Sequence, residues 1–416
     1  MPPPTSFTTQ FLPSLSSRLG ILTLNNPNSL NALNLEMIRS MVPTLTDWQA
    51  QSSSGTTADG GRHDNDGIIR ATLMVGTPYT TKSGTIKPTF CAGGDVKAVY
   101  LAGLQKGNPL PYQFFREEYQ LNHLIATQSS NMPQISIWDG VVMGGGVGLS
   151  VHGKYRVATE NTVFAMPECN IGFFPDVGGT WWIPRLKIYA PWHTKSYVGG
   201  VGNYLALTGA RLKGDDLLYA GIATHYVQSN RLEELKRSLI DATSMENDDD
   251  SSSNTEDCAA SVLMSFHDGS INLDNSFLSK NRNDIDYAFD GKDSIEEIIE
   301  SLESMGPDSQ FGKSTLETLQ SLSPTSLKVT LEGLKRGAKA RSIGEALQME
   351  YRMAMAFMRD GSDFYEGIRA ALVDKDGKPK WNPASLSEVS EEIVNSYFEE
   401  LGEDELTFTR KESAKL

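Results

Sequence analysis

The stretch D-G-V-V-M-G-G-G-V-G-L-S, residues 139–150, decides how this chain folds. Within this stretch a strand gives way to three glycines, and an apolar run typical of the start of a helix follows. Glycine has no Cβ, so the backbone N–H groups at such a junction can point at a ligand oxygen. The stretch therefore predicts a strand–turn–helix unit whose turn binds an oxygen atom.

Two further stretches combine glycine turns with acids. In F-C-A-G-G-D-V-K (90–97) a strand-like run enters two glycines, and Asp95 can cap the helix that follows. In F-A-M-P-E-C-N-I-G-F-F-P-D-V-G-G-T (164–180), Glu168 and Asp176 stand in an apolar run. Two converging turns would stabilise a developing oxyanion, and one such donor changes a rate by roughly 10²–10³. Taken singly, the glycines could serve tight turns and the acids could reach the surface.

Around these stretches the chain alternates between strand and helix signals and then becomes helical. Asn34 can cap a helix over 35–48, and Ser294 with Glu297 forms a capping box for a helix through residue 305. Polar runs at 51–67 and 246–257 predict loops, and residues 187–203 predict a third irregular segment. The remaining expected elements are strands at 19–24, 68–75, 134–138, 155–159 and 163–165 and helices at 112–127 and 391–401.

The composition excludes several classes of protein. The 416 residues include 37 Lys and Arg against 52 Asp and Glu, a net charge of −15, which argues against binding to nucleic acid or to an anionic membrane surface. Three cysteines cannot form a disulfide framework. No run of about 18 apolar residues is present, so no transmembrane helix is expected. An acidic chain can still bind a phosphorylated ligand through local cations and backbone N–H groups.

Common catalytic motifs fail on inspection. G-K-S at 312–314 lacks the spacing and the preceding strand of a phosphate-binding loop, and G-L-S-V-H-G at 148–153 is not a nucleophile elbow. The glycines at 144–148 do not match a dinucleotide fingerprint. The six histidines are scattered and the cysteines isolated, so no metal site is expected.

Taken in order, F-C-A-G-G-D, M-G-G-G-V-G-L-S and M-P-E…I-G-F-F-P-D-V-G-G resemble the crotonase (enoyl-CoA hydratase/isomerase) superfamily. The resemblance covers about residues 19–401 and is close to the 3-hydroxyisobutyryl-CoA hydrolase branch, whose distinctive segments are mainly C-terminal. Matching segments include L-N-N-P…L-N-A-L-N (24–34), F-F-R-E-E-Y (114–119), A-L-T-G-A-R-L-K-G (206–214), S-P-T-S-L-K (323–328), M-E-Y-R (349–352), D-F-Y-E-G-I-R-A (363–370) and D-K-D-G-K-P-K-W (374–381).

The resemblance implies an α/β fold, a crotonase-like spiral of ββα units with a C-terminal helical region. Residues 1–18 are then expected to be a flexible N-terminal segment and residues 19–228 the spiral core. Residues 229–416 are expected to be mostly helical, with a disordered acidic loop near 246–257.

The resemblance also implies the site. The oxyanion-hole N–H groups fall on Gly94 and Gly145, and the catalytic acids on Glu168 and Asp176. Glu118, Gly145, Glu168 and Asp176 are expected to bind substrate. No metal is implied, and no cofactor is expected, because coenzyme A is part of the substrate. A crotonase hydratase has a second glutamate where this chain has Gly148, which argues against the addition of water to an enoyl double bond.

The expected reaction is hydrolysis of the thioester of 3-hydroxyisobutyryl-CoA, with 3-hydroxypropionyl-CoA as a second candidate substrate, in valine degradation. The alternatives are an enoyl-CoA hydratase or isomerase of the same superfamily and a non-catalytic CoA-binding protein. Whether Glu168 activates water or attacks the carbonyl itself is left open, as is the oligomeric state, with a homo-oligomer as one candidate. Lys97 and Arg116 are candidates for contacting the CoA phosphates.

The final tripeptide, Ala414-Lys415-Leu416, is a close variant of the S-K-L peroxisomal address. It predicts a peroxisomal location and recognition by the peroxisomal import receptor, with the mitochondrial matrix as the alternative. The partners expected are thus an acyl-CoA and this receptor, with no nucleic acid and no membrane.

Overall fold

The computed structural model describes residues 7–11, 18–53, 69–128, 132–188, 199–244 and 255–408. Its centre is a six-stranded sheet with the order β1-β2-β3-β6-β8-β10, in which every neighbouring pair is parallel except β1 with β2. The strands are β1 (Phe7–Phe11), β2 (Leu19–Leu24), β3 (Ala71–Gly76), β6 (Gln134–Trp138), β8 (Tyr155–Ala158) and β10 (His225–Tyr226). Two small sheets are added, β4 (Tyr79–Thr80) with β5 (Ile86–Lys87), and β7 (Val141–Met143) with β9 (Val163–Ala165).

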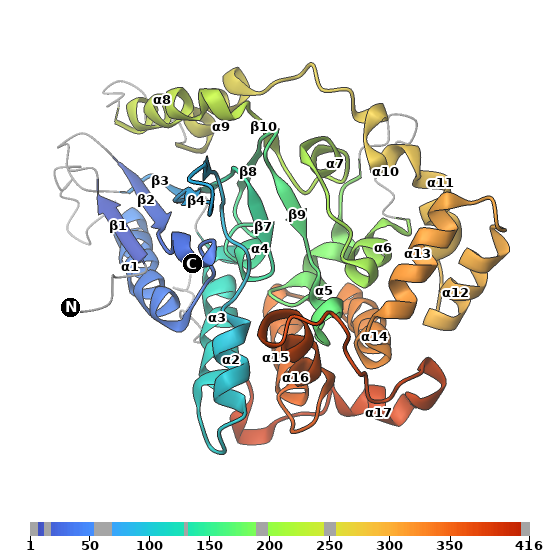
Figure 1. The fold of residues 1–416 in the computed structure, drawn as a ribbon. Helices are drawn as coiled ribbons and strands as arrows, with labels where there is room; N and C mark the ends of the chain where they lie inside the picture. The colour runs from blue at the N-terminus through green and yellow to red at the C-terminus, as the bar shows by residue number, and fades with distance from the viewer. Residues whose placement is uncertain are drawn as a thin grey trace.

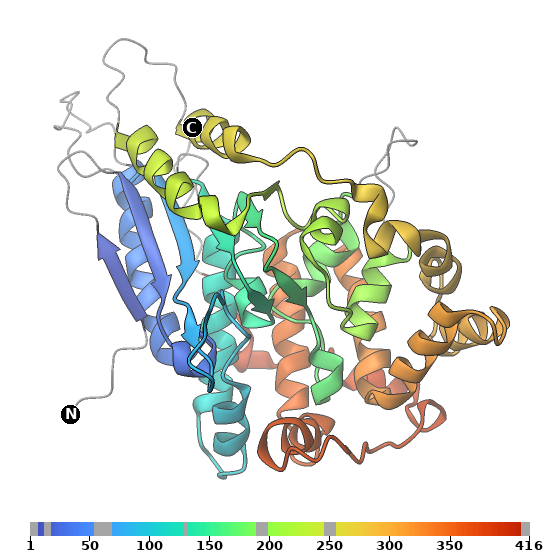
Figure 2. The same ribbon diagram turned by 45° about the horizontal axis from the view of Figure 1, so that its top comes forward.

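Both faces of the main sheet are covered, and alternating residues of each strand serve the two faces. Leu73 of β3 and Ile135 of β6 pack with helices α8 (Leu232–Ser244) and α9 (Thr255–Phe266). Met74 and Trp138 instead join the main core, which also contains the apolar face of α1 (Leu35–Ser53). Figures 1 and 2 show α8 and α9 along one side of the sheet and α1 along the other.

The second half of the chain is helical and packs around the core rather than extending from it. Figure 1 shows α14 (Pro324–Lys339) and α15 (Ile343–Phe357) beside the short helix α5 (Gly179–Trp182), with α16 (Asp363–Ile368) next to α15. The other helices of the described residues are α2 (Val96–Gly103), α3 (Leu110–Ala126), α4 (Gly145–Gly148), α6 (Val201–Thr208), α7 (Gly214–Tyr219), α10 (Phe277–Lys280), α11 (Arg282–Phe289), α12 (Ile295–Ser304), α13 (Gln310–Ser321) and α17 (Glu391–Ser396).

The predicted α/β fold with parallel strands and a helical C-terminal region is confirmed. Asn34 caps α1, Asp95 caps α2 and Ser294 caps α12, as their side-chain chemistry predicts. Helix α17 ends at Ser396, earlier than the predicted Leu401, and Phe398 is buried where the helix was expected to continue.

The predictions for the N-terminal segment, for the two polar loops and for residues 187–203 are only partly comparable with the structure. A strand, β1, occupies residues 7–11 of the segment predicted to be flexible, because these residues pair with β2. The predicted loops at 51–67 and 246–257 lie mostly outside the described residues, and α9 begins at Thr255 within the second of them. Most of 187–203 also lies outside the described residues.

Candidate active site

Three neighbouring parallel segments end at the same side of the molecule and bring the glycine turns together. Val142 of β7 pairs with Cys91 on one side and with Phe164 of β9 on the other. Parallel neighbours advance in step, so Gly94 and Gly145, each three residues beyond the Cys91–Val142 pair, arrive together. The third segment leads from β9 to Glu168, at the start of a 3₁₀ turn over Glu168–Ile171.

The N–H groups of Gly94 and Gly145 are both directed away from the surrounding backbone ladders. Leu33 donates to the Gly93 carbonyl and accepts from the Asp95 N–H, so the intervening Gly94 N–H faces the other way. Gly145 is the first residue of α4, where an N–H has no partner within the helix. A Cβ built on Gly145 would lie 3.2 Å from the Gly94 nitrogen, so the two turns are in contact.

The three predicted acids lie beside these turns. A Cβ built on Gly145 would lie 2.6 Å from Glu118 Oε1, and one built on Gly144 would lie 3.0 Å from Glu168 Oε1. The carboxyls of Glu118, on α3, and of Glu168 each keep one oxygen without a hydrogen-bond partner among the described residues. Asp176 instead accepts a hydrogen bond of 2.8 Å from the Tyr119 hydroxyl. Two of the buried acids are therefore available to a ligand, and the third is held by the protein.

Burial sets the electrostatics of this cluster, since all three side chains are at most 6% exposed. Desolvation raises the pKa of Glu118 well above its usual range, and the nearby Asp176 and Glu168 raise it further. Desolvation and Asp176 likewise raise the pKa of Glu168. Desolvation raises the pKa of Asp176 to about 7, although the hydrogen bond from Tyr119 favours its ionised form. Asp176 can therefore exchange its proton near neutral pH, and the other two acids hold their protons to a higher pH than exposed glutamates do.

The acids open into a cavity of about 490 Å³. This volume is typical of a site for a small molecule. Most of the remaining wall is apolar, and the exposed Arg211 lies at its edge. The apolar lining consists of Ala92, Val96, Phe114, Phe115, Met143, Pro167, Ile171 and Phe173.

The segment from Asp176 to Thr180, here called the Asp176 turn, has an unusual backbone. Val177 and Gly178 have φ values of +51° and +84°, both in the left-handed region. For a β-branched residue this conformation costs about 1–3 kcal/mol and persists only where neighbours impose it. Val177 faces Gly148, and a Cβ built on Gly148 would lie 2.5 Å from Val177 Cβ. A side chain at position 148 would therefore collide with Val177.

Glu168 and the following residues to Gly172, here called the Glu168 turn, lie against α16. A Cβ built on Gly172 (φ +68°) would lie 2.1 Å from the Asp363 carbonyl oxygen, and one built on Gly367 would lie 2.2 Å from the Ile171 carbonyl carbon. Only glycine permits this backbone-to-backbone approach.

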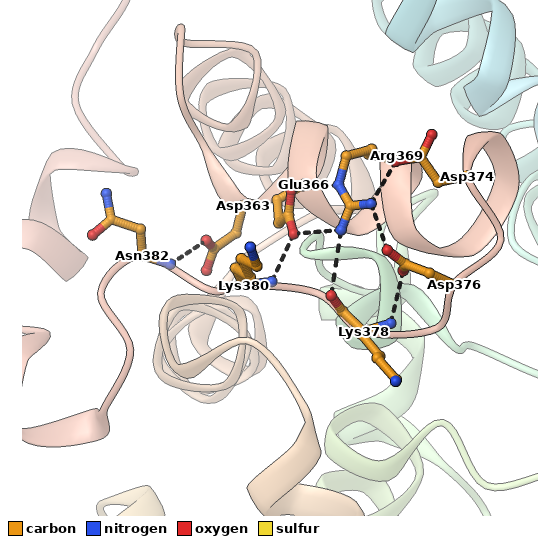
Figure 3. Close-up of polar contacts among 8 residues, drawn as sticks. All are labelled: Asp363, Glu366, Arg369, Asp374, Asp376, Lys378, Lys380 and Asn382. Carbon is orange, nitrogen blue, oxygen red and sulfur yellow. Dashed lines mark hydrogen bonds and ion pairs between the residues drawn. The ribbon is translucent and has the colours of Figure 1, made fainter.

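The loop after α16 folds back on that helix, as Figure 3 shows. The Arg369 guanidinium pairs with Glu366, Asp374 and Asp376 at 2.8, 2.6 and 2.8 Å. Farther along the loop, the Asn382 N–H donates to Asp363 Oδ1 at 2.8 Å. The C-terminal segments that carry the family resemblance thus form the outer wall behind the Glu168 turn.

Several residues around the site were not predicted. Tyr119, His152 and Glu350 all contact the Asp176 turn. Tyr119 lies beside Glu118 in the sequence, so it could have been considered. Glu350 lies 172 positions from its partner Gly178, and no spacing rule could have linked them.

Arg116, a candidate for contacting the CoA phosphates, and Cys91, which adjoins the first glycine turn, each have contacts within the protein. Arg116 donates to the carbonyls of Asp404 and Glu405 and stacks over Tyr351, so its guanidinium joins α3 to the C-terminal segment. The Cys91 thiol is buried, and desolvation raises its pKa to about 12, as expected for a packing residue.

Neither a metal centre nor a membrane span is found in the part of the chain that the structure describes. No group of three or more His, Cys, Asp or Glu side chains there could hold an ion. No described helix combines the length and apolarity that crossing a membrane requires.

Comparison with known proteins gives consistent matches along the chain. The model of a family described as enoyl-CoA hydratase/isomerase matches residues 19–61 and 79–398. The chain is 44% identical over 389 residues to the mitochondrial 3-hydroxyisobutyryl-CoA hydrolase of Xenopus laevis, covering 93% of this chain and 88% of the relative. It is 41% identical over 390 residues to the human protein of the same name, covering 94% and 88%.

Solved structures agree with the fold. A carnitinyl-CoA dehydratase from Mycobacterium thermoresistibile superimposes with a TM-score of 0.77 at 34% identity, covering 97% of this chain and 98% of the other. An enoyl-CoA hydratase from Rhodobacter sphaeroides superimposes with a TM-score of 0.73 at 29% identity, covering 97% and 100%.

Proposed function

The chain belongs to the enoyl-CoA hydratase/isomerase family, and from this premise we propose that it hydrolyses the thioester of 3-hydroxyisobutyryl-CoA to 3-hydroxyisobutyrate and CoA. The observation that carries the proposal is the meeting of Glu168 with two glycine turns in one partly apolar cavity. The relatives of this name at 41% and 44% identity, matched over nearly the whole chain, support the choice of substrate.

In the proposed mechanism, the thioester oxygen lies between the N–H groups of Gly94 and Gly145. These donors stabilise the negative charge that forms on this oxygen when the carbonyl carbon becomes tetrahedral. The close contact of the two turns supports this arrangement. A Cβ built on Gly145 would lie close to both the Gly94 nitrogen and Glu118, so the two N–H groups and this acid border the same small space.

Glu168 supplies the attacking group by one of two routes. As a general base it takes a proton from water, whose oxygen then bonds to the carbonyl carbon as the C–S bond breaks. As a nucleophile it bonds to that carbon itself, and water later hydrolyses the resulting anhydride. In both routes the sulfur leaves as a thiolate, whose conjugate acid has a pKa near that of cysteine, about 8.5, so little acid assistance is needed. Its raised pKa makes Glu168 a stronger base than an exposed glutamate.

Asp176 and Glu118 are proposed to bind the 3-hydroxyl group or the water. Asp176, ionised and held by Tyr119, accepts a hydrogen bond. Glu118 is buried beside two other acids, so its neutral form donates one. An acyl-CoA without the 3-hydroxyl leaves these groups unpaired and is expected to react more slowly.

The test is release of free thiol from 3-hydroxyisobutyryl-CoA beside 3-hydroxypropionyl-CoA and acetyl-CoA. The branched 3-hydroxy substrate is expected to react fastest and acetyl-CoA slowest. A single turnover in ¹⁸O-water separates the two routes, because label in Glu168 supports the anhydride and label only in the product acid removes it. Thiol release from none of the three substrates would contradict the proposal and favour a non-catalytic CoA-binding protein.

A hydratase is the second candidate, since both superimposed structures are named for reactions of that class. The packing of Val177 against Gly148 argues against it, because no second glutamate fits at that position. Loss of the enoyl absorbance of crotonyl-CoA would support the hydratase, and its persistence would support the hydrolase.

The proposed cellular setting is valine degradation in the mitochondrial matrix. The names of the Xenopus and human relatives include the word mitochondrial, which supports this alternative over the peroxisome predicted from the C-terminal tripeptide. Residues Ala414, Lys415 and Leu416 lie outside the described residues, and nothing in the comparisons supports an import receptor or a homo-oligomer. The proposed reaction requires no separate cofactor, because coenzyme A enters with the substrate.

A further inference from the structure

The Asp176 turn needs external support to keep its shape. Val177 and Gly178 are consecutive left-handed residues, and Val177 has a β-branched side chain that disfavours this conformation. Asp176 is the residue immediately before this pair, so any relaxation of the turn would move its carboxyl group.

Glu350 of α15, a helix that packs against α5, supplies that support. The side chain is fully buried, and both of its oxygens are used. Oε2 accepts from the Gly178 N–H at 2.7 Å, while Oε1 accepts from the Thr180 N–H at 2.9 Å and from the Thr180 hydroxyl at 2.7 Å. Among the described residues, no Lys or Arg is paired with this carboxyl. Its hydrogen bonds within the described residues all go to the Asp176 turn.

Two further side chains hold the same turn. His152 Nε2 lies 2.8 Å from the Val177 carbonyl oxygen, which can only accept, so this nitrogen carries the hydrogen. Desolvation lowers the pKa of His152 to about 4, so the ring is neutral near pH 7. Tyr119 donates to Asp176 itself. The turn is thus bonded to three side chains that come from three separate parts of the chain.

We propose that Glu350 is a positioning residue, which fixes the Asp176 carboxyl against the substrate by bonding the turn that carries it. The inference rests on the proposed function, because it assigns the C-terminal helix α15 a part in that reaction. Burying a carboxyl without a cationic partner destabilises the folded protein, and an apolar side chain of the same volume would destabilise it less. Its contacts explain its presence, since two of the three donors are backbone N–H groups of a strained turn.

The first test replaces Glu350 by glutamine and measures kcat and KM separately. Glu350→Gln keeps the shape of the side chain, but its NH₂ group cannot accept, so one side of the turn loses its acceptor. Misplacing a catalytic group by about 1 Å costs up to about 100-fold in rate, so kcat is expected to fall by about 10- to 100-fold with KM changed by less than about threefold. An unchanged kcat would overturn the proposal.

The second test asks whether the effect passes through Asp176. In an Asp176→Asn background, Glu350→Gln is expected to cost less than about threefold, because the group it positions is already lost. An equal loss in both backgrounds would indicate a purely structural role and overturn the proposal. If Glu350→Gln does not fold, Thr180→Val removes the hydroxyl donor alone, and it should give a smaller, several-fold loss with the same dependence on Asp176.

Amide hydrogen exchange gives a readout that does not depend on the substrate. Glu350→Gln should speed exchange in the peptide that covers residues 177–182 and leave β6 and β8 unchanged, and unchanged exchange in that peptide would overturn the proposal. Asp216→Asn is the matched control, because Asp216 is a buried carboxyl that accepts from the Leu278 N–H away from the site. It should change neither kcat nor this peptide. If the unmodified protein releases no thiol, the proposed function fails, and exchange still tests the bonding of the turn.

Discussion

Two short turns carry the two acids nearest the proposed reaction, and different interactions hold each turn in place. The Glu168 turn is supported by direct backbone packing against α16, at contacts that only Gly172 and Gly367 permit. The Asp176 turn is supported by hydrogen bonds to buried side chains, chiefly Glu350 and Tyr119. Both supports come in part from the C-terminal helices, so this region completes the site of the core.

The difference matches the work proposed for each acid. Glu168 keeps one carboxyl oxygen without a partner among the described residues, as a base or nucleophile requires. The Asp176 carboxyl accepts a hydrogen bond from Tyr119, and Glu350 bonds the backbone of the residues that follow it in the turn, as an orienting group requires. Backbone packing therefore fixes the turn of the proposed reactive acid and leaves one of its carboxyl oxygens without a partner among the described residues, whereas a hydrogen bond fixes the carboxyl of the proposed orienting acid.

The largest expected effect distinguishes the two acids by their roles. Glu168→Gln should lower kcat by about 10³-fold or more, because the attacking group is lost. Asp176→Asn should lower it by about 10²-fold, because an amide can still occupy the position and form some of its hydrogen bonds. Thiol release under saturating substrate measures both.

Melting temperatures provide the control for these variants. Both replacements remove a buried carboxyl, so each should leave the protein at least as stable as the parent near pH 8. A Glu168→Gln enzyme with near-normal activity would remove Glu168 from the mechanism and reverse the comparison between the turns.

The backbone support of the Glu168 turn is tested by Gly172→Ala. The added Cβ would lie 2.1 Å from a backbone oxygen of α16, so the free energy of unfolding should fall by about 3 kcal/mol. Gly361→Ala is the matched control, since Gly361 also has a left-handed φ (+77°) but open space around its Cβ position. It should cost only about 1–2 kcal/mol. Equal losses in denaturant unfolding would show that φ alone, and not the contact with α16, makes Gly172 necessary.

Because the pKa values of the buried acids are raised, activity and stability should both depend on pH, and in opposite directions. The proposed mechanism requires Glu168 to lose its proton, so kcat/KM should rise with pH, with its midpoint well above the usual range of a glutamate, because burial and the nearby Asp176 raise the pKa of Glu168. Stability should move in the opposite direction. The folded protein keeps protons on these acids where the unfolded chain releases them, so stability is lost as pH rises from about 4 to about 7 and beyond.

Glu118→Gln tests the pH dependence of stability. It removes one member of the cluster, so the melting temperature at pH 8 should rise by a few degrees and depend less on pH. Thermal melts at pH 5 and pH 8 measure the change. A protein that is more stable at pH 8 than at pH 5, with or without Glu118, would contradict the raised pKa values.

The sequence predicts the parts of this site that obey local rules. Glycine pairs at strand ends, the caps Asn34, Asp95 and Ser294, and strands such as 134–138 follow from residue type and spacing, and the structure agrees. The meeting of Gly94 with Gly145 depends on which strands are neighbours, which the family resemblance implied but no local signal states.

Contacts at long range are a different matter. The bond from Gly178 to Glu350 and the approach of Gly172 to Asp363 join segments more than 170 residues apart. These contacts depend on tertiary packing, and no pattern of residues within either segment predicts them. Strand β1 was missed for a related reason, because its pairing with β2 and not its composition defines it.

The smallest expected effect concerns the outer wall behind the Glu168 turn. Arg369→Gln breaks the ion pairs that fasten the loop 374–382 to α16 in Figure 3, but the contact of Gly172 with Asp363 is a backbone contact and does not depend on them. Ion pairs near the surface contribute little, so the melting temperature should fall by about 2 °C or less and kcat should stay within about twofold. Raising the salt concentration should reduce even this difference. A large loss of kcat would mean that charge pairs, and not backbone packing, hold the Glu168 turn, and the contrast between the two turns would then disappear.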